Sequence, residues 1–162
     1  MLEMPSDLIF RSPCQGDIDA VTELELVSFR SAWKQEFFES ELNAVGRFNL
    51  VVEDPSGALV GYLFTMYYLD EMHVNKIAVA EDWRRFGIAS SLMAKCFEFA
   101  RSNDVLTVSL EARESNDSAR ALYSRLGFDE VYVRQRYYSD GESAVVMTCR
   151  FTDGGEPKPG DS

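Results

Sequence analysis

The chain has 162 residues, of which 46% are hydrophobic and 27% are charged, close to the averages of globular domains. These proportions exclude a disordered chain, and the length predicts one domain, over residues 1–151. There are 16 Lys and Arg against 27 Asp and Glu, giving a net charge of −11. A non-specific nucleic-acid binder needs a basic surface, so nucleic acid is excluded as a partner and a cationic partner is favoured.

A membrane protein and a metal protein are also disfavoured. The longest apolar stretch covers residues 58–69, whereas a membrane-spanning helix needs about 20 residues. The first residues include Glu3 and Asp7 and no basic group, which does not fit a signal peptide. The three cysteines are far apart and odd in number, so we expect no disulfide framework, no metal site and a cytoplasmic location.

The first part of the chain predicts one strand and two helices. Residues 8–10 are a short apolar strand candidate, and Asp17 can cap a helix that follows it. A second helix is expected over residues 35–45, with Gly46 ending it. The first helix has apolar residues at helical spacing, namely Ile18, Val21, Leu24 and Phe29.

Three strands are expected next, over residues 48–53, 59–69 and 72–79. The turn residues 54–57 join the first two as a hairpin. A helix over residues 88–100 and an apolar strand over residues 105–110 then follow.

The last part predicts a helix and two strands. Asn116 can cap the helix, which Gly127 ends, and strands over residues 128–138 and 143–151 complete the domain. The order β-α-α-β-β-β-α-β-α-β-β indicates an α/β fold with a mixed sheet and helices on its faces. Residues 152–162 have little to bury, and we expect them to be a disordered tail.

A candidate anion site lies between the strand ending at residue 79 and the helix beginning near residue 88. The start of a helix offers unpaired N–H groups and a partial positive charge that can hold a phosphate. A glycine permits close approach of the backbone, small residues leave room for a diphosphate, and arginines add charge. The segment reads Arg84, Arg85, Phe86, Gly87, Ile88, Ala89 and Ser90.

This segment resembles the acyl-CoA signature Q/R-x-x-G-x-G/A of the GCN5-related N-acetyltransferases (GNAT), with Arg84, Gly87 and Ala89 at the defining positions. The resemblance covers about residues 6–151. It implies a mixed, mostly antiparallel sheet of about seven strands flanked by four helices, with acetyl-CoA as donor and CoA as product. It also implies that the strand residues Ile77, Ala78 and Val79 hold the pantetheine arm and the thioester carbonyl.

The second half is similar to the bacterial ribosomal-protein-alanine N-acetyltransferases. The similarity lies in residues 110–116, 121–128 and 134–147. Two positions depart from that pattern: Ser143 replaces an acidic residue, and Ala32 replaces the proline before Trp33. Both lie where the resemblance places the entry of the acceptor peptide.

The resemblance implies roles for residues that move protons. Glu111 would be the general base, His73 is a second candidate for it, and Tyr123 would protonate the CoA thiolate. Asn116 would contact the cofactor as well as cap a helix. Each has an alternative reading: Glu111 paired with Arg113 or a backbone amide, His73 as a packed or surface ring, and Tyr123 as a core aromatic.

The same resemblance implies where the acceptor binds. Tyr137 and Tyr138 would hydrogen-bond the peptide backbone, and Phe29 and Trp33 would line the wall for its first side chain. Aromatic packing, across strands or in the core, is the alternative for these four residues.

The charges are unevenly divided along the chain. Residues 1–82 carry 5 basic and 15 acidic side chains, whereas residues 83–151 carry 10 and 9. The sequence therefore predicts an N-terminal acetyltransferase acting on a basic protein tail, such as the N-terminal alanine of a small-subunit ribosomal protein. A polyamine acetyltransferase and a catalytically silent acyl-CoA-binding module are the alternatives. No oligomeric state is indicated.

Overall fold

The computed structural model describes residues 5–151, so the tail over residues 152–162 lies outside the described part. The chain forms two compact units. Unit 1 contains the residues up to Met66 together with Asn75–Cys96, and unit 2 contains Tyr67–Val74 and the residues from Phe97 onward. Strands β3 (Leu59–Tyr68) and β4 (Glu71–Val79) and helix α3 (Ile88–Ser102) each contribute to both units.

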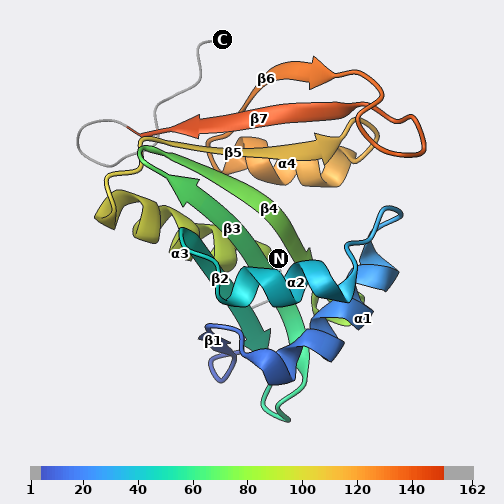
Figure 1. Ribbon diagram of the computed structural model, residues 1–162, viewed down its shortest axis with the longest axis vertical. Coiled ribbons are helices and arrows are strands. Elements are labelled where there is room, and N and C mark those ends of the chain that lie inside the picture. Colours follow the sequence, from blue (N-terminus) through green and yellow to red (C-terminus); the bar gives the residue numbers. More distant parts are fainter. Residues whose placement is uncertain (1–4, 152–162) are drawn as a thin grey trace. The chain divides into compact units, whose positions relative to one another are not determined.

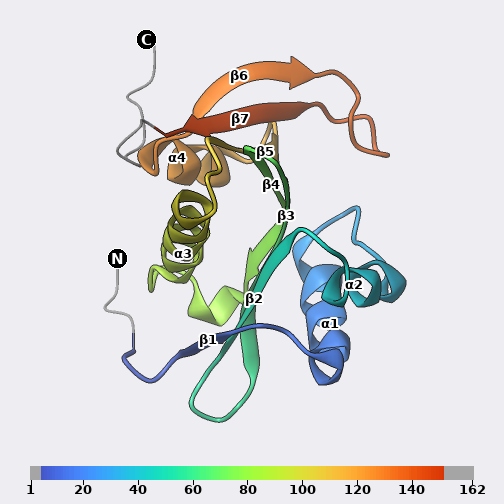
Figure 2. The same ribbon diagram turned by 60° about the vertical axis from the view of Figure 1, so that its left-hand side comes forward.

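Unit 1 contains an antiparallel β-meander. Strand β1 (Ile9–Arg11) pairs with β2 (Arg47–Glu53), and β2 pairs with β3 around the predicted turn. Asp54 shapes that turn, since its carboxylate accepts the backbone N–H groups of Ser56 and Ala58. Helices α1 (Ile18–Ser28) and α2 (Gln35–Leu42) cover one face of β2 and β3, and α3 covers the other (Figure 2).

The core of unit 1 lies between α1, α2 and the meander. The rings of Phe38, Tyr62 and Phe64 contact one another, with centroids 5.0–5.9 Å apart. All three side chains are fully buried, as are Val21 of α1 and Val51 of β2. The apolar spacing of α1 thus places its inward face on this aromatic cluster.

Unit 2 contains the strand pairs made by β5, β6 and β7 (Figure 1). The first residues of β4 run parallel to β5 (Thr107–Arg113), and β5 pairs antiparallel with β7 (Ala144–Arg150). The edge strand β6 (Asp129–Arg134) pairs antiparallel with β7. The seven strands follow the order β1-β2-β3-β4-β5-β7-β6. With helix α4 (Asp117–Arg125) as the fourth helix, this confirms the predicted mixed, mostly antiparallel sheet and the element order.

Three local predictions were wrong: the end of the second helix, the end of strand β6 and the cap at Asp17. Helix α2 ends at Leu42, and Gly46, with φ +74°, lies in the connection to β2 rather than at the helix end. Strand β6 ends at Arg134 instead of residue 138, because the chain turns at Arg136, whose φ is +52°.

Asp17 does not cap α1 through its side chain. Its carboxylate instead accepts the backbone N–H of Cys14 at 2.7 Å and two hydrogen bonds from Arg11 at 2.8 Å. Arg11 also donates to Glu53 at 2.7 Å, so this arginine joins β1 to both β2 and the start of α1. The carboxylate of Asp17 is thus engaged by residues that precede the helix rather than by the first turn of α1.

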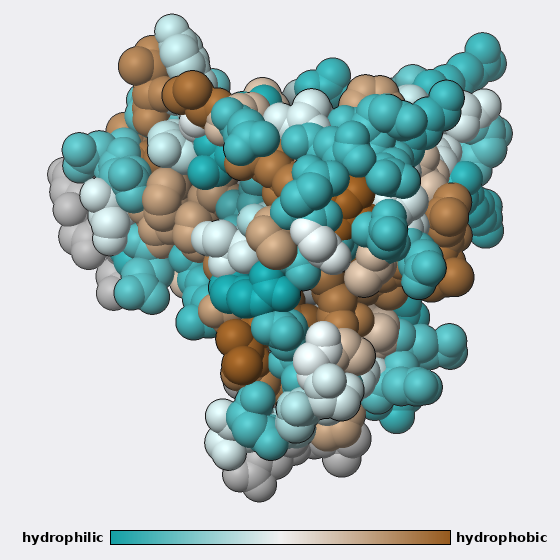
Figure 3. All heavy atoms as spheres, turned by 60° about the horizontal axis from the view of Figure 1, so that its bottom comes forward, coloured by the Kyte–Doolittle hydropathy of each residue, from teal (hydrophilic) through white to brown (hydrophobic). Residues whose placement is uncertain are grey.

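The described surface mixes polar and apolar side chains, and Figure 3 shows the two kinds interspersed on one face. Exposed large apolar residues include Val27, Val45 and Tyr68. Exposed apolar side chains of this kind are ordinary in folded proteins. Over residues 5–151, no helix has the length and apolar composition needed to cross a bilayer. The cytoplasmic location stays a prediction.

Candidate functional site

The candidate anion site, residues 84–90, forms a tight turn in unit 1, and we call it the cradle. After β4 a short 3-10 helix spans Glu81–Trp83, and α3 begins at Ile88. Arg85 and Gly87 both have left-handed backbones, with φ +71° and +82°. Because the first N–H groups of a helix lack partners within it, this turn presents backbone donors at the positive end of α3. The arrangement suits an anion such as a diphosphate.

Close backbone packing fixes the start of α3. A Cβ atom at Gly61 of β3 would lie 3.2 Å from the carbonyl oxygen of Ala78 and 3.6 Å from a methyl group of Ile88. Gly61 therefore lets β3, the end of β4 and the first turn of α3 come together without a side chain between them. Ala78 and Val79 are buried and Ile77 is half-buried. Their predicted contacts with pantetheine stay a prediction.

In unit 2, the two candidate bases form one pair. His73 on β4 lies opposite Ser109 of β5 in the parallel register, and Glu111 follows two residues later on the same face of β5. The Nε2 atom of His73 is 2.5 Å from Oε2 of Glu111. The Glu111 side chain is 13% exposed and that of His73 is 33% exposed. Both side chains are thus partly open to water.

Arg134 supplies a positive charge to the same pair. Its Nε lies 3.8 Å from Oε1 of Glu111, and its guanidinium faces the ring of Tyr137 at 5.9 Å. The alternative partner predicted for Glu111, Arg113, instead pairs with Asp140 at 2.9 Å and Glu142 at 2.8 Å. Sequence reasoning missed Arg134, because it lies on another strand, β6, 23 positions after Glu111.

Tyr123 lies on α4, and its ring meets that of Phe128 edge-on at 5.8 Å. Asn116 caps this helix as predicted, since its side chain accepts the backbone N–H of Ala119 at 3.2 Å. Burial raises the pKa of Tyr123 to about 12. The phenol therefore keeps its proton at neutral pH and can act as a hydrogen-bond donor. The ring is both a core aromatic and a candidate acid.

Tyr137 and Tyr138 lie in the turn after β6, with their rings edge-to-face at 5.1 Å. Tyr137 is half exposed, whereas Tyr138 is covered by the guanidinium of Arg113 at 4.0 Å. Burial, and then the negative charge of Glu111, raise the pKa of Tyr137. Burial, and to a smaller degree the charge of Glu111, raise the pKa of Tyr138 as well, so the two tyrosines differ in their exposure rather than in their proximity to the candidate base.

The departure at Ser143 has a local consequence. Its hydroxyl donates to the side chain of Gln135 at 3.1 Å. The adjacent Glu142 accepts a hydrogen bond from Arg113 at 2.8 Å and the backbone N–H of Ser115 at 2.9 Å. The turn before β7 is thus held by a carboxylate one residue before Ser143.

Phe29 and Trp33, the predicted acceptor wall, follow α1 in unit 1 and pack against its core. Both face the ammonium group of Lys76, at 4.2 Å and 5.5 Å from the ring centroids. Lys76 also pairs with the buried Glu25. Sequence reasoning missed this pair, although Glu25 lies one helical turn after Val21 on the apolar face of α1, an unusual place for a carboxylate.

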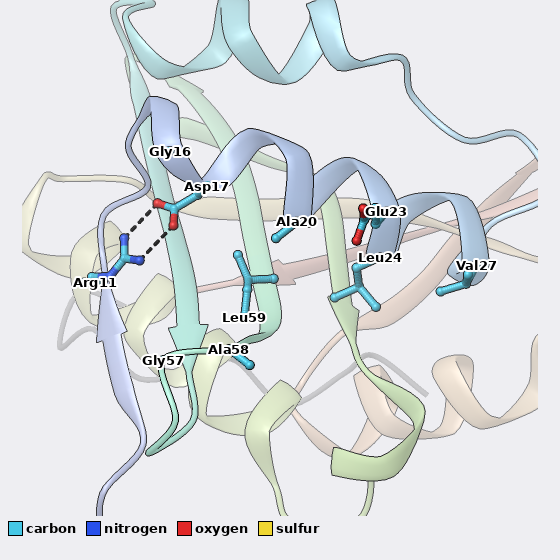
Figure 4. Close-up of a pocket in the computed structure, with 10 residues that line it drawn as sticks. All are labelled: Arg11, Gly16, Asp17, Ala20, Glu23, Leu24, Val27, Gly57, Ala58 and Leu59. Carbon is cyan, nitrogen blue, oxygen red and sulfur yellow. Dashed lines mark hydrogen bonds and ion pairs between the residues drawn. The ribbon is translucent and has the colours of Figure 1, made fainter.

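A separate hollow of about 580 Å³ lies beside the outer side of α1 in unit 1. Figure 4 shows Asp17 facing Arg11 at one end and apolar α1 side chains opposite Ala58 and Leu59. None of the residues predicted for catalysis or binding lines it. Of its charged lining residues, Arg11 and Asp17 are paired with each other, and Glu23 is exposed. Among residues 5–151, no cluster of three or more His, Cys, Asp or Glu could hold a metal ion.

Comparison with known proteins identifies the family. The model of the acetyltransferase (GNAT) family matches residues 18–128. The chain belongs to this family. It is an acetyltransferase, and the resemblance stated from its signature is confirmed.

Three similar proteins illustrate the match. The [ribosomal protein bS18]-alanine N-acetyltransferase of Escherichia coli K12 is 32% identical over 134 residues, covering 81% of this chain and 89% of that protein. An N-alpha-acetyltransferase of Saccharolobus solfataricus P2 is 30% identical over 155 residues, covering 87% and 92%. The crystal structure of the ribosomal-protein-S18-alanine N-acetyltransferase from Escherichia coli has a TM-score of 0.80 and 27% identity, covering 96% of each chain.

Proposed function

We propose that this GNAT acetyltransferase transfers an acetyl group from acetyl-CoA to the α-amino group of a protein N-terminus, with the N-terminal alanine of a small-subunit ribosomal protein as the acceptor. The observation that carries the proposal is the contact between His73 and Glu111. This pair is a proton acceptor in the same unit as the buried phenol of Tyr123. The names of the bacterial and archaeal relatives support an amino-terminal acceptor.

The cradle fits acetyl-CoA. The left-handed turn at Arg85 and Gly87 and the start of α3 provide backbone N–H donors, and Arg84 and Arg85 provide positive charge for the diphosphate. Small residues, Ala89 and Ser90, leave the approach open. When bound, acetyl-CoA supplies an activated thioester. The residues of this chain then have to accept a proton from the amine and provide one to the leaving sulfur.

A weak base is sufficient for an α-amino acceptor. An α-amino group has an ordinary pKa of about 7.7–8.0, whereas a lysine amine is near 10.4. Glu111 takes the proton from the amine, directly or through a water molecule, and His73 holds the carboxylate in place through its Nε2 atom. A fraction of the α-amine is already neutral near pH 7, so a weak base is enough to remove the proton from the rest. A lysine amine holds its proton more tightly, and the same proton transfer would be much harder.

Tyr123 provides the hydrogen bond to the developing thiolate. Its raised pKa keeps the O–H intact over the working range, and its burial excludes competing water. The hydroxyl is held on α4, whose first turn is fixed by the Asn116 cap. In this assignment Tyr123 contributes to the rate of transfer more than to the affinity for acetyl-CoA.

Aromatic residues would contact the acceptor. Tyr137 would contact the peptide backbone, and Phe29 and Trp33 would face its first side chain. The first 82 residues carry 15 acidic and 5 basic side chains, a field that attracts a basic ribosomal protein to a cytoplasmic enzyme. The same field would attract a polyamine, which is the second candidate acceptor.

A direct assay separates these acceptors. The enzyme is incubated with labelled acetyl-CoA and a peptide library that varies the first two residues, with spermidine in parallel, and products are read by mass spectrometry. We expect acetylation of the α-amine, with Ala-first peptides preferred. Faster turnover of spermidine would replace the protein acceptor by a polyamine. Binding of acetyl-CoA with no turnover on any acceptor would reject the catalytic assignment.

A further inference from the structure

Glu25 is a fully buried carboxylate in α1 that is surrounded by three donors. Its Oε1 accepts the hydroxyl of Tyr62 at 2.5 Å, and its Oε2 accepts the backbone N–H of Trp33 at 2.8 Å. The third donor is the ammonium group of Lys76, 2.9 Å from Oε2. These residues come from α1, β3, β4 and the loop after α1, all of unit 1.

Lys76 completes this arrangement with an aromatic enclosure. Its ammonium lies over the rings of Phe29 and Trp33, and its side chain is only 14% exposed. A carboxylate together with aromatic faces is the set of groups that binds an alkylammonium ion. We call the arrangement of Glu25, Phe29 and Trp33 the ammonium site. In this chain the site is filled by the chain's own lysine.

Removing the lysine would leave the rest of the site intact. Glu25 would keep its hydrogen bonds from Tyr62 and Trp33, but its buried carboxylate would lose Lys76, the one cation that pairs with it among residues 5–151. A buried charge without a counter-ion is strongly unfavourable. A foreign ammonium group of similar size that could enter beside Phe29 and Trp33 would therefore be bound in its place.

We propose that Lys76 is a specificity-determining residue, because by filling the ammonium site it closes the acceptor wall to long cationic first side chains. This inference rests on the proposed function, in which Phe29 and Trp33 face the first residue of the acceptor. With Lys76 in place, the wall offers aromatic surface and a neutralised ion pair, and a small uncharged side chain fits. Without Lys76, the wall offers a carboxylate in an aromatic pocket.

The first test measures the site without any catalysis. Lys76→Ala is unfolded thermally with 1-butylammonium chloride, and separately with 1-butanol, which has the same chain and no charge. We expect butylammonium to raise the Tm of Lys76→Ala and to leave the wild type unchanged, while butanol raises neither. The double variant Glu25→Gln, Lys76→Ala should lose the response. Lys95→Ala is the matched control, because Lys95 stacks on Phe10 and is exposed.

The second test measures selectivity. The ratio of kcat/KM for a Lys-first peptide to that for an Ala-first peptide is compared between wild type and Lys76→Ala. We expect the ratio to rise by at least about tenfold, because the new contact is a charged hydrogen bond in a buried site. An unchanged ratio in a variant that butylammonium stabilises would overturn the specificity role. It would leave the proposed function standing, provided that the Ala-first peptide is still acetylated.

The two tests also separate the two proposals. If the wild type acetylates no peptide, the proposed function fails, and the Tm response still decides whether the ammonium site exists. An absent Tm response in folded Lys76→Ala overturns the ammonium site. If Lys76→Ala does not fold alone, it is refolded from urea with and without butylammonium. Recovery only with the amine supports the site, and failure with the amine overturns it.

Discussion

The side chains of His73 and Glu111 are 38 positions apart in sequence and meet at 2.5 Å between Nε2 and Oε2. The parallel pairing of β4 with β5 causes this contact, because it places His73 beside Ser109 and leaves Glu111 one step further along the same face. The two candidate bases of the sequence are therefore not independent. Changing either one alters the environment of the other.

The first prediction concerns the base. Glu111→Gln removes the carboxylate that accepts the proton and should lower kcat/KM across the pH profile by about 100-fold or more, within the usual range for a general base. His73→Gln keeps a hydrogen-bonding group beside Glu111 and should retain at least about a tenth of the activity. Steady-state kinetics at several pH values would measure both.

Two controls make that result interpretable. Glu114→Gln changes an exposed carboxylate three residues later and should leave kcat/KM near the wild-type value. Because the pair is in contact, the double variant should lose less than the product of the two single losses. If Glu111→Gln has near-normal activity and His73→Gln is folded but inactive, the base is His73 instead.

The second prediction concerns Tyr123. Tyr123→Phe keeps the ring against Phe128 and removes only the hydroxyl, so kcat should fall by about 10–1000-fold with little change in the KM for acetyl-CoA. The raised pKa, about 12, means that the phenol stays protonated well above pH 9. We therefore expect no loss of kcat from its ionisation between about pH 8 and 10, below the ordinary phenol pKa.

Tyr67→Phe serves as the control for the loss of a phenol, since Tyr67 is in the same unit and packs on Phe99. It should leave kcat unchanged. If Tyr123→Phe shows a normal kcat while chemistry limits the rate, Tyr123 is a core aromatic only.

The third prediction concerns the cradle. Gly87 has φ +82°, so Gly87→Glu introduces strain as well as a negative side chain where the diphosphate would lie. We expect it to abolish acetyl-CoA binding in calorimetry while the protein remains folded. Gly57→Glu is the matched control, because Gly57 has a similar φ of +86° and lies in the β2–β3 turn. Wild-type affinity in folded Gly87→Glu would exclude the cradle.

The fourth prediction concerns acid stability. Hydrogen bonds from Arg11 lower the pKa of Asp17 from 3.8 to about 2. Since the folded pKa lies below the unfolded one, the stabilisation is present above about pH 4 and is lost as the pH falls towards 2, and it amounts to about 2 kcal/mol. Urea unfolding of wild type and Asp17→Asn should show this difference at pH 6 and a smaller one near pH 2.5.

Asp19→Asn, at an exposed position of α1, should show no such pH-dependent difference. A constant gap between wild type and Asp17→Asn from about pH 2.5 to 6 would mean that Asp17 contributes through packing rather than through its charge.

Local signals were sufficient for most element positions. The cap at Asn116 and the left-handed Gly127 bound α4 where the sequence predicts, because a capping side chain acts on N–H groups within three residues of itself. The same logic failed at Asp17, where Arg11 of β1 takes the carboxylate. The carboxylate of Asp17 is held by residues that precede it, Arg11 and Cys14, and makes no hydrogen bond to the first turn of α1.

The candidate site was only partly predictable. The order of residues and the family signature identified Glu111, His73 and Tyr123 separately. Neither showed that His73 binds Glu111 or that Arg134 lies beside it, because both contacts depend on the register of paired strands. A strand register brings together side chains whose sequence separation carries no signal.

The amino-acid sequence by itself determined the element order, the glycine-bearing turn before α3 and the acidic character of the first 82 residues, since each depends on local composition and spacing. Only the tertiary structure decided that Glu25, on the apolar face of α1, is satisfied by Tyr62, Trp33 and Lys76. A buried charge is stable only where several distant segments supply donors at once. That condition is met by packing three elements together and cannot be read from any one of them.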